Sequence, residues 1–208
     1  RYSNTTREVA QNGRRGALMI SLDIKHPDAL AFIKSKRDLT KITGANISIK
    51  LNKEFMKCLD KDRDYLQSFH KGHTIHTNTV NAKDTWNEII KSAHSVAEPG
   101  ILFWDRVHEY SPDGVYPQYR AVTTNPCGEI PMQAFDACRL VALNLFSYVV
   151  NPFTEDAVFD FDLFYKHNYE GLVISDDIVD LELEHIDRIL DKINKDPEIP
   201  SLKATELQ

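Results

Sequence analysis

The chain has 208 residues and a mass of 23.8 kDa, which is enough for one sizeable domain with a core of its own. Apolar residues make up 42% of it and charged residues 27%, a balance typical of globular proteins. The net charge of −6 argues against nucleic acid or an anionic membrane as the main partner, and no apolar run reaches the length of a membrane span.

The first third of the sequence alternates between strand and helix signals. Residues 17–24 form a short apolar run that predicts a strand, and a helix is expected over 29–36 after a His-Pro-Asp start. Residues 47–51 alternate as a second strand, and Asn52 is placed to cap a helix over 53–59. This is a β-α-β-α pattern.

The middle of the chain repeats this scheme less clearly. Residues 64–69 predict a short strand, followed by a polar loop as far as Asn81. Helical spacing over 82–97 predicts a helix that Pro99-Gly100 ends. Residues 101–104 then read as a strand buried on both faces of a parallel sheet.

Two further elements are expected toward the C-terminus. The apolar run 138–148 predicts another buried strand, and 161–194 predicts a long helix with an apolar stripe, which Gly171 is placed to interrupt. Alternating strands and helices favour an α/β fold with a parallel sheet or a segment of a barrel.

The chain has three widely spaced cysteines: Cys58, Cys127 and Cys138. No two of them have the CxxC spacing. Such a pattern fits a reducing compartment, the cytoplasm, where a disulfide is catalytic or transient rather than structural. Cys58 lies within a predicted helix beside apolar neighbours, and core packing explains it.

The segment Asn125-Pro-Cys-Gly-Glu129 admits two interpretations. If it is extended, Asn125, Cys127 and Glu129 project to one side, as an amide, a thiol and a carboxylate able to hold a polyhydroxylated substrate. The alternative is an Asn-Pro turn with a buried cysteine that happens to precede a glutamate.

Other candidate sites have simpler explanations. His70, His73 and His76 have a spacing that can bind zinc or copper, yet they lie in a polar stretch around a glycine and without an obvious fourth ligand. The basic run 12–16 could contact phosphate, but a basic turn explains it, because it precedes a strand instead of opening a helix. Asp176-Asp177 fits the solvated face of the long helix.

Several motifs in order resemble the large, catalytic subunit of ribonucleotide reductase, particularly its adenosylcobalamin-dependent class II members. They are the 125–129 motif followed by Cys138, the run 13–28 that begins Gly-Arg-Arg-Gly, and Thr-Gly-Ala-Asn-Ile-Ser-Ile-Lys over 43–50. The similarity runs from about Gly13 to Lys203, so it covers nearly the whole chain.

The resemblance implies a fold and a set of roles. The fold would be about half of a ten-stranded α/β barrel, one domain over 1–208, with a catalytic finger loop. Cys127 would be the thiyl-radical cysteine, Glu129 the base on the substrate 3′-hydroxyl, and Asn125 a hydrogen-bond partner of the substrate hydroxyls. Cys138 would be one member of the redox-active pair.

The sequence also departs from the family pattern. The usual Cys-Asn-Leu-Gly-Ser is here Cys138-Arg-Leu-Val-Ala142. The resemblance places the partner cysteine on a strand that precedes Arg1, and the loop that grips the substrate phosphates after Gln208. The expected fragment would therefore be inactive alone.

The implied activity is reduction of ribonucleotides with adenosylcobalamin as cofactor, or with a radical from a metal-containing second subunit. The expected partners are the ribonucleotide, a thioredoxin-like reductant and the remaining segments or subunits of the reductase. No metal ligands, nucleic acid or membrane are implied. Two alternatives remain: a noncatalytic half-barrel that assembles with a complementary chain, and a metal protein built on the histidine-rich stretch.

Overall fold

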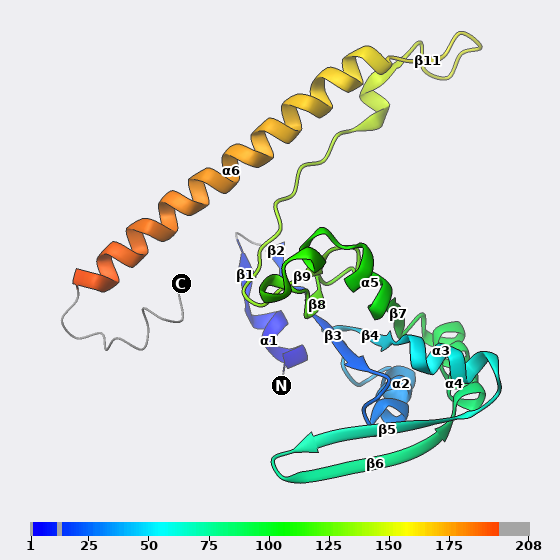
Figure 1. Ribbon diagram of the computed structural model, residues 1–208. Helices are drawn as coiled ribbons and strands as arrows, with labels where there is room; N and C mark the ends of the chain where they lie inside the picture. The colour runs from blue at the N-terminus through cyan, green and yellow to red at the C-terminus, as the bar shows by residue number, and fades with distance from the viewer. Residues whose placement is uncertain (1, 12–13, 196–208) are drawn as a thin grey trace. The chain divides into compact units, whose positions relative to one another are not determined.

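The computed structural model describes residues 2–11 and 14–195, and it divides into two compact units at Asp136 and Ala137 (Figure 1). The first unit is mixed α/β, and the second is dominated by one helix. Each unit is described by itself below.

A three-stranded parallel sheet forms the centre of the first unit. Its order is β3 (Met19–Asp23), β4 (Asn46–Leu51) and β7 (Gly100–Phe103). Strands and helices alternate along this part of the chain, as predicted. Parallel pairing of neighbouring strands needs such helices as crossover connections. Trp104, however, begins α5 (Trp104–Tyr110) instead of ending a strand. β7 is also not buried on both faces, since Gly100 and Phe103 are exposed and Ile101 and Leu102 are only half-buried.

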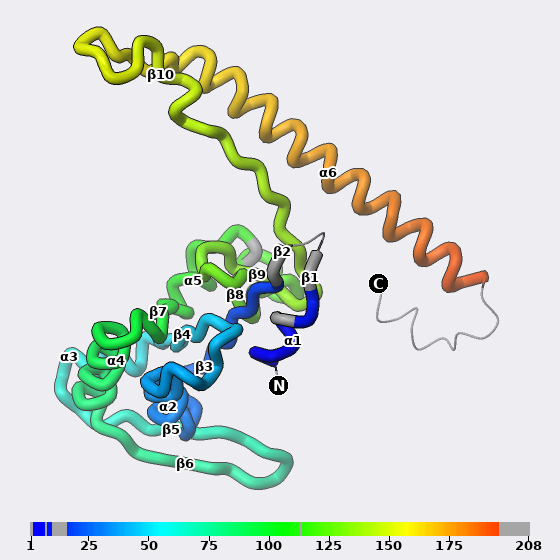
Figure 2. Tube along the Cα trace, turned by 180° about the vertical axis from the view of Figure 1, so that it is seen from behind, coloured from blue at the N-terminus to red at the C-terminus, as the bar shows by residue number. Residues whose placement is uncertain are grey.

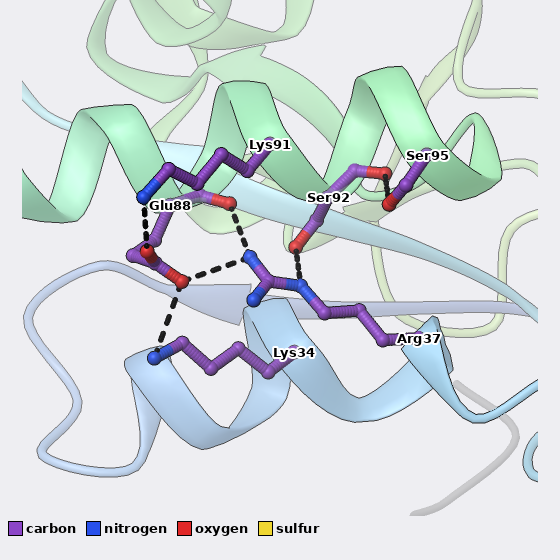
Figure 3. A network of polar contacts seen from close by, with 6 residues as sticks. All are labelled: Lys34, Arg37, Glu88, Lys91, Ser92 and Ser95. Carbon is purple, nitrogen blue, oxygen red and sulfur yellow. Dashed lines mark hydrogen bonds and ion pairs between the residues drawn. The ribbon is translucent and has the colours of Figure 1, made fainter.

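Three helices cover one face of the sheet: α2 (Ala29–Lys34), α3 (Lys53–Asp60) and α4 (Ala82–Val96). The predicted cap of α3 is confirmed, since Asn52 Oδ1 accepts a hydrogen bond from the Phe55 N–H at 2.8 Å. The 3₁₀ turn η1 (Ser35–Arg37) extends α2. Glu88 of α4 joins the helices through ion pairs with Lys34 and Arg37 (Figure 3).

The two faces of the sheet differ in chemistry, because successive side chains of a strand point to opposite sides. One face is apolar and packs with the helices in a single buried core, which includes Ile24, Ile33, Ile49, Leu51, Phe55, Tyr65 and Ile89. The other face carries polar side chains at in-register positions of β3 and β4: Ser21, Asp23, Asn46, Ser48 and Lys50. Helix α2 lies on one side of these strands and the β8–β9 segment on the other (Figures 1 and 2).

A long antiparallel hairpin stands where the sequence predicted a polar loop. It consists of β5 (Asp64–Lys71), the expected strand, and β6 (Thr74–Asn81), which was not expected. Gly72 turns the chain with φ +59°, as a two-residue hairpin connection requires. The prediction was wrong because most side chains of β6 are exposed, so backbone pairing forms the strand without an apolar pattern to signal it.

Short elements complete the first unit. They are α1 (Tyr2–Glu8), β1 (Ala10–Gln11), β2 (Arg14–Arg15), the 3₁₀ turns η2 (Pro112–Val115) and η3 (Pro117–Tyr119), β8 (Thr123–Thr124) and β9 (Pro131–Met132). The basic run 12–16 thus falls partly on β2, while residues 12–13 lie outside the described residues.

The second unit is built around α6 (Phe161–Lys195), which confirms the long predicted helix and runs through Gly171 without a break. Before it come η4 (Leu145–Tyr148), β10 (Val149–Val150) and β11 (Val158–Phe159). The Tyr148 ring packs on Phe159, Phe164 and His167, with centroid distances of 5.3–5.8 Å.

The buried strand predicted over 138–148 is wrong. Residues 137–144 form no strand and are mostly exposed, and 145–148 form η4. Apolar residues favour a strand only where other strands pair with them, and none of the described strands pairs with this run. Instead, Arg139 forms an ion pair with Glu182 of α6.

The mixed α/β class is therefore confirmed, and the described strands form separate sheets without closing into a barrel. Among the described residues, the search for a helix with the length and apolar character of a membrane span finds none.

Candidate functional site

The segment that carries Cys127 is a tight turn between β8 and β9. These strands pair antiparallel, and the Asn125 carbonyl accepts a hydrogen bond from the Gly128 N–H at 3.0 Å. Pro126 in the second position favours such a turn, and Gly128 takes φ +88°, which L side chains rarely adopt. The extended row of three side chains is therefore wrong, and the alternative of an Asn-Pro turn is confirmed.

Asn125 closes the base of this turn. Its side chain is buried, and Oδ1 accepts a hydrogen bond from the Ile130 N–H at 3.0 Å. Its own N–H donates to the Ile130 carbonyl at 3.1 Å. The structure thus gives Asn125 a clear structural task, which the sequence analysis did not assign to it.

Cys127 and Glu129 are both exposed on the turn. Cys127 occupies the third position, next to the apex, so its thiol is open to approach. The buried cysteine of the alternative interpretation is wrong for the same reason. Both predicted side chains therefore lie on the same short hairpin and are accessible.

Side chains of the polar sheet face hold this hairpin. Asn46 Nδ2 donates to the Pro126 carbonyl at 2.7 Å, and Lys50 Nζ donates to the Val122 carbonyl. The hydroxyls of Ser21 and Thr123 lie 3.4 Å apart. The hairpin is thus attached to β3 and β4 along its length.

Lys50 has an unusual environment for a lysine. Its ammonium lies 4.0 Å from the centre of the Trp104 ring, a cation–π distance. Burial lowers the pKa of Lys50, and the Asp23 carboxylate partly opposes this. Together with Ser21 and Thr123, Lys50 lines a cavity of about 410 Å³ beside the hairpin.

Sequence reasoning missed Ser21, Asn46 and Lys50. The available signal was the alternation of Asn46-Ile-Ser-Ile-Lys50. A central strand of a parallel sheet is normally apolar on both faces. Polar residues at every second position therefore indicate that one face is not packed in an apolar core.

The other two cysteines differ in setting. Cys138 is exposed and lies in the second unit, one residue before the Arg139 that pairs with Glu182. Cys58 lies in α3, half-buried against the core, as predicted.

The histidine-rich stretch does not form a metal centre in the structure. His70 and His76 lie on β5 and β6, His73 lies in the turn between them, and all three are exposed. In the described part of the chain, no group of three or more metal-ligating side chains is placed to hold an ion.

Comparisons with known proteins identify the family of this chain. Residues 1–197 match the family model for the ribonucleotide reductase barrel domain. A vitamin B12-dependent ribonucleoside-diphosphate reductase of Thermoplasma acidophilum is 32% identical over 190 residues, which is 90% of this chain and 24% of that protein. The protein of the same name from Mycobacterium tuberculosis (strain CDC 1551 / Oshkosh) is 29% identical over 150 residues, 69% of this chain and 21% of its own length.

A vitamin B12-dependent ribonucleotide reductase of Streptomyces clavuligerus is 26% identical over 178 residues, covering 74% of this chain and 18% of that protein. The chain thus spans about a quarter or less of the length of these curated relatives. Because the family model covers nearly all of the sequence, the chain belongs to the ribonucleotide reductase barrel-domain family.

Proposed function

We propose that this chain is part of the catalytic barrel of a ribonucleotide reductase, which converts ribonucleotides to deoxyribonucleotides by thiyl-radical chemistry. The observation that carries the proposal is Cys127, exposed on a turn that the polar face of a parallel sheet holds, in a chain of this family. The β8–β9 hairpin is then the finger loop, and residues 1–208 form about half of a ten-stranded barrel.

A sheet with helices on one face and polar residues on the other fits the wall of such a barrel. The helix-covered face becomes the outside, and the face that bears Ser21, Asn46 and Lys50 becomes the lumen. An interior that binds a polar substrate needs polar groups there, whereas a filled barrel core needs apolar ones.

The proposed reaction assigns one step to each side chain. The sulfur radical of Cys127 takes the 3′-hydrogen of the ribose, and Glu129 accepts the proton of the 3′-hydroxyl. Two thiols are then oxidised to a disulfide: one of their hydrogens leaves with the 2′-hydroxyl as water, and the other goes to C2′. The 3′-hydrogen returns from Cys127, and Glu129 gives its proton back to the 3′-oxygen. Cys138 supplies one of those two thiols, and its partner comes from outside this chain.

Asn125 acts in this scheme chiefly through the turn. Its Oδ1 accepts the Ile130 N–H, while its amide Nδ2 can donate to a substrate hydroxyl. Holding the turn rigid serves catalysis as well, because hydrogen transfer requires the sulfur within about 3–3.5 Å of the reacting hydrogen's carbon.

The proposed cofactor is adenosylcobalamin, which generates the radical when bound. The exposed thiol of Cys127 would be accessible to such a group. The names of the relatives support cobalamin over a radical from a metal-containing subunit. A thioredoxin-like protein would reduce the disulfide, and the remaining reductase segments would complete the barrel.

A noncatalytic role in assembly is the second candidate. The outer edges of β3 and β7 pair with no further strand among the described residues, and unpaired edges normally acquire partners. In that case the chain would bind a complementary segment without supporting turnover.

Reconstitution tests the proposal. The chain, combined with the complementary segments of a class II reductase, should form deoxyribonucleotide only when both adenosylcobalamin and a dithiol are present. Omitting either should abolish product. A complex that assembles correctly but forms no product under complete conditions would favour the noncatalytic role.

A further inference from the structure

We propose that Asn46 is a positioning residue for Cys127 and acts through the Pro126 carbonyl. Asn46 Nδ2 donates to that oxygen at 2.7 Å. This oxygen belongs to the peptide group that joins Pro126 to Cys127. The hydrogen bond therefore fixes the orientation of that peptide plane, and with it the direction in which the Cys127 side chain leaves the backbone. The inference rests on the proposed function only in taking Cys127 as the reacting thiol.

Asn46 is anchored firmly enough to do this. It is the first residue of β4, the central strand, and its own N–H donates to the Leu18 carbonyl at 2.8 Å. Ile47 and Ile49, which follow it, are 1% and 0% exposed in the core. The hairpin, by contrast, has strands of only two residues on each side.

The contacts between sheet and hairpin have a regular arrangement. Asn46 and Lys50 lie four residues apart on one face of β4 and bond the carbonyls of Pro126 and Val122, which are also four residues apart. The segment 122–126 therefore runs antiparallel across β4. Lys50 holds the far end of this segment, while Asn46 holds the peptide next to Cys127.

This placement gives Asn46 a specific effect on the reacting atom. A displacement of about 1 Å at a catalytic group can cost on the order of a hundredfold in rate. Losing the bond to the Pro126 carbonyl would let the turn open more often, without disturbing the core beneath β4.

Amide hydrogen exchange tests the opening of the turn. In Asn46→Ala, the Gly128 N–H, which closes the turn on the Asn125 carbonyl, should exchange about two- to tenfold faster, the range that one such hydrogen bond supports. The Phe55 N–H, held by Asn52, should not change.

Asn52→Ala is the matched control. It removes the asparagine that directly follows the other end of β4, and it should accelerate exchange at Phe55 while leaving Gly128 unchanged. This reciprocal pattern separates a local effect on the turn from a general loss of stability.

Asn46→Asp tests, through a pH dependence, whether the effect comes from the hydrogen-bond donor itself. Near pH 7 its carboxylate cannot donate and faces the Pro126 carbonyl, so Gly128 should exchange at least as fast as in Asn46→Ala. Near pH 3 the carboxyl is largely protonated and can donate again, so the ratio to the native chain should fall toward one.

Turnover completes the test. In the reconstituted reductase, Asn46→Ala should lower kcat with little change in KM, because a positioning residue acts on the Cys127 turn and its Nδ2 is already bonded to the Pro126 carbonyl. Unchanged exchange at Gly128 in both Asn46 variants, or faster exchange with native kcat, would overturn the positioning role. Failure of the proposed function would be seen in a different experiment: a variant that lacks the Cys127 sulfur would keep full activity.

Discussion

At the scale of single residues, Glu88 is paired with three basic side chains. Hydrogen bonds from Lys91, Lys34 and Arg37 lower the pKa of its carboxyl from 4.5 to about 2 (Figure 3). A carboxyl whose pKa is lower in the folded state stabilises the fold above its unfolded pKa. This contribution is lost as the pH falls from 4.5 toward 2.

Glu88→Gln should therefore lower the free energy of unfolding near pH 7. The difference from the native chain should shrink as the pH falls from 4.5 toward about 2, because the native carboxyl becomes protonated over this range too. Urea unfolding at a series of pH values measures this. Asp177→Asn, at an exposed position on α6, serves as the control with a small effect, and a constant difference for Glu88→Gln at every pH would contradict the account.

The segment around Asn125 shows how sequence can group residues correctly and still assign them the wrong geometry. The motif pointed to residues 125–129, and the structure brings these residues together on one hairpin. The side-chain period of two misled the geometric prediction, because Pro126 and Gly128 are also turn-forming residues. Local sequence does not decide between the two conformations; the bonds from Asn46 and Lys50 help to fix the turn.

At the scale of elements, α6 tests the cost of a glycine within a helix. Gly171 lies inside the helix, and Val141 Cγ1 is 3.4 Å from the position that a Cβ would occupy, an ordinary contact. Glycine in a helix interior costs roughly 0.5–1 kcal/mol relative to alanine.

Gly171→Ala should thus stabilise α6 by about 0.5–1 kcal/mol. Thermal melts followed by circular dichroism at the helix band measure this, with Ser175→Ala as a second substitution on the same helix. A lower melting temperature for Gly171→Ala would mean that Val141 packs too closely to accept a methyl group.

Elements with strong local signals were predictable, and those that depend on distant partners were not. Capping at Asn52 and the apolar alternation of β4 define α3 and β4 from their own residues. β6 forms because β5 lies beside it, although its polar alternation resembles a loop. The run 138–148 has the composition of a strand but no described strand to pair with.

At the scale of the whole molecule, exposed surface predicts association. Along α6, apolar side chains remain uncovered, among them Leu172, Leu181 and Leu183, which are 64%, 63% and 54% exposed. The sheet edges at β3 and β7 add unpaired backbone groups. The chain alone should therefore show a mass above 23.8 kDa in solution.

Light scattering across a concentration series measures this mass. Adding complementary reductase segments should replace self-association by a defined complex, because the same surfaces would then be covered. A folded monomer at all concentrations would argue against a half-barrel that needs a partner.

The central claim is that the Cys127 sulfur performs the radical step of ribonucleotide reduction. Deoxyribonucleotide formation by the reconstituted reductase tests it most directly, with Cys127→Ser compared against Cys58→Ser, a change at the half-buried thiol of α3. The account predicts no product from Cys127→Ser and near-native turnover from Cys58→Ser. Product formed by Cys127→Ser at a native rate would contradict it.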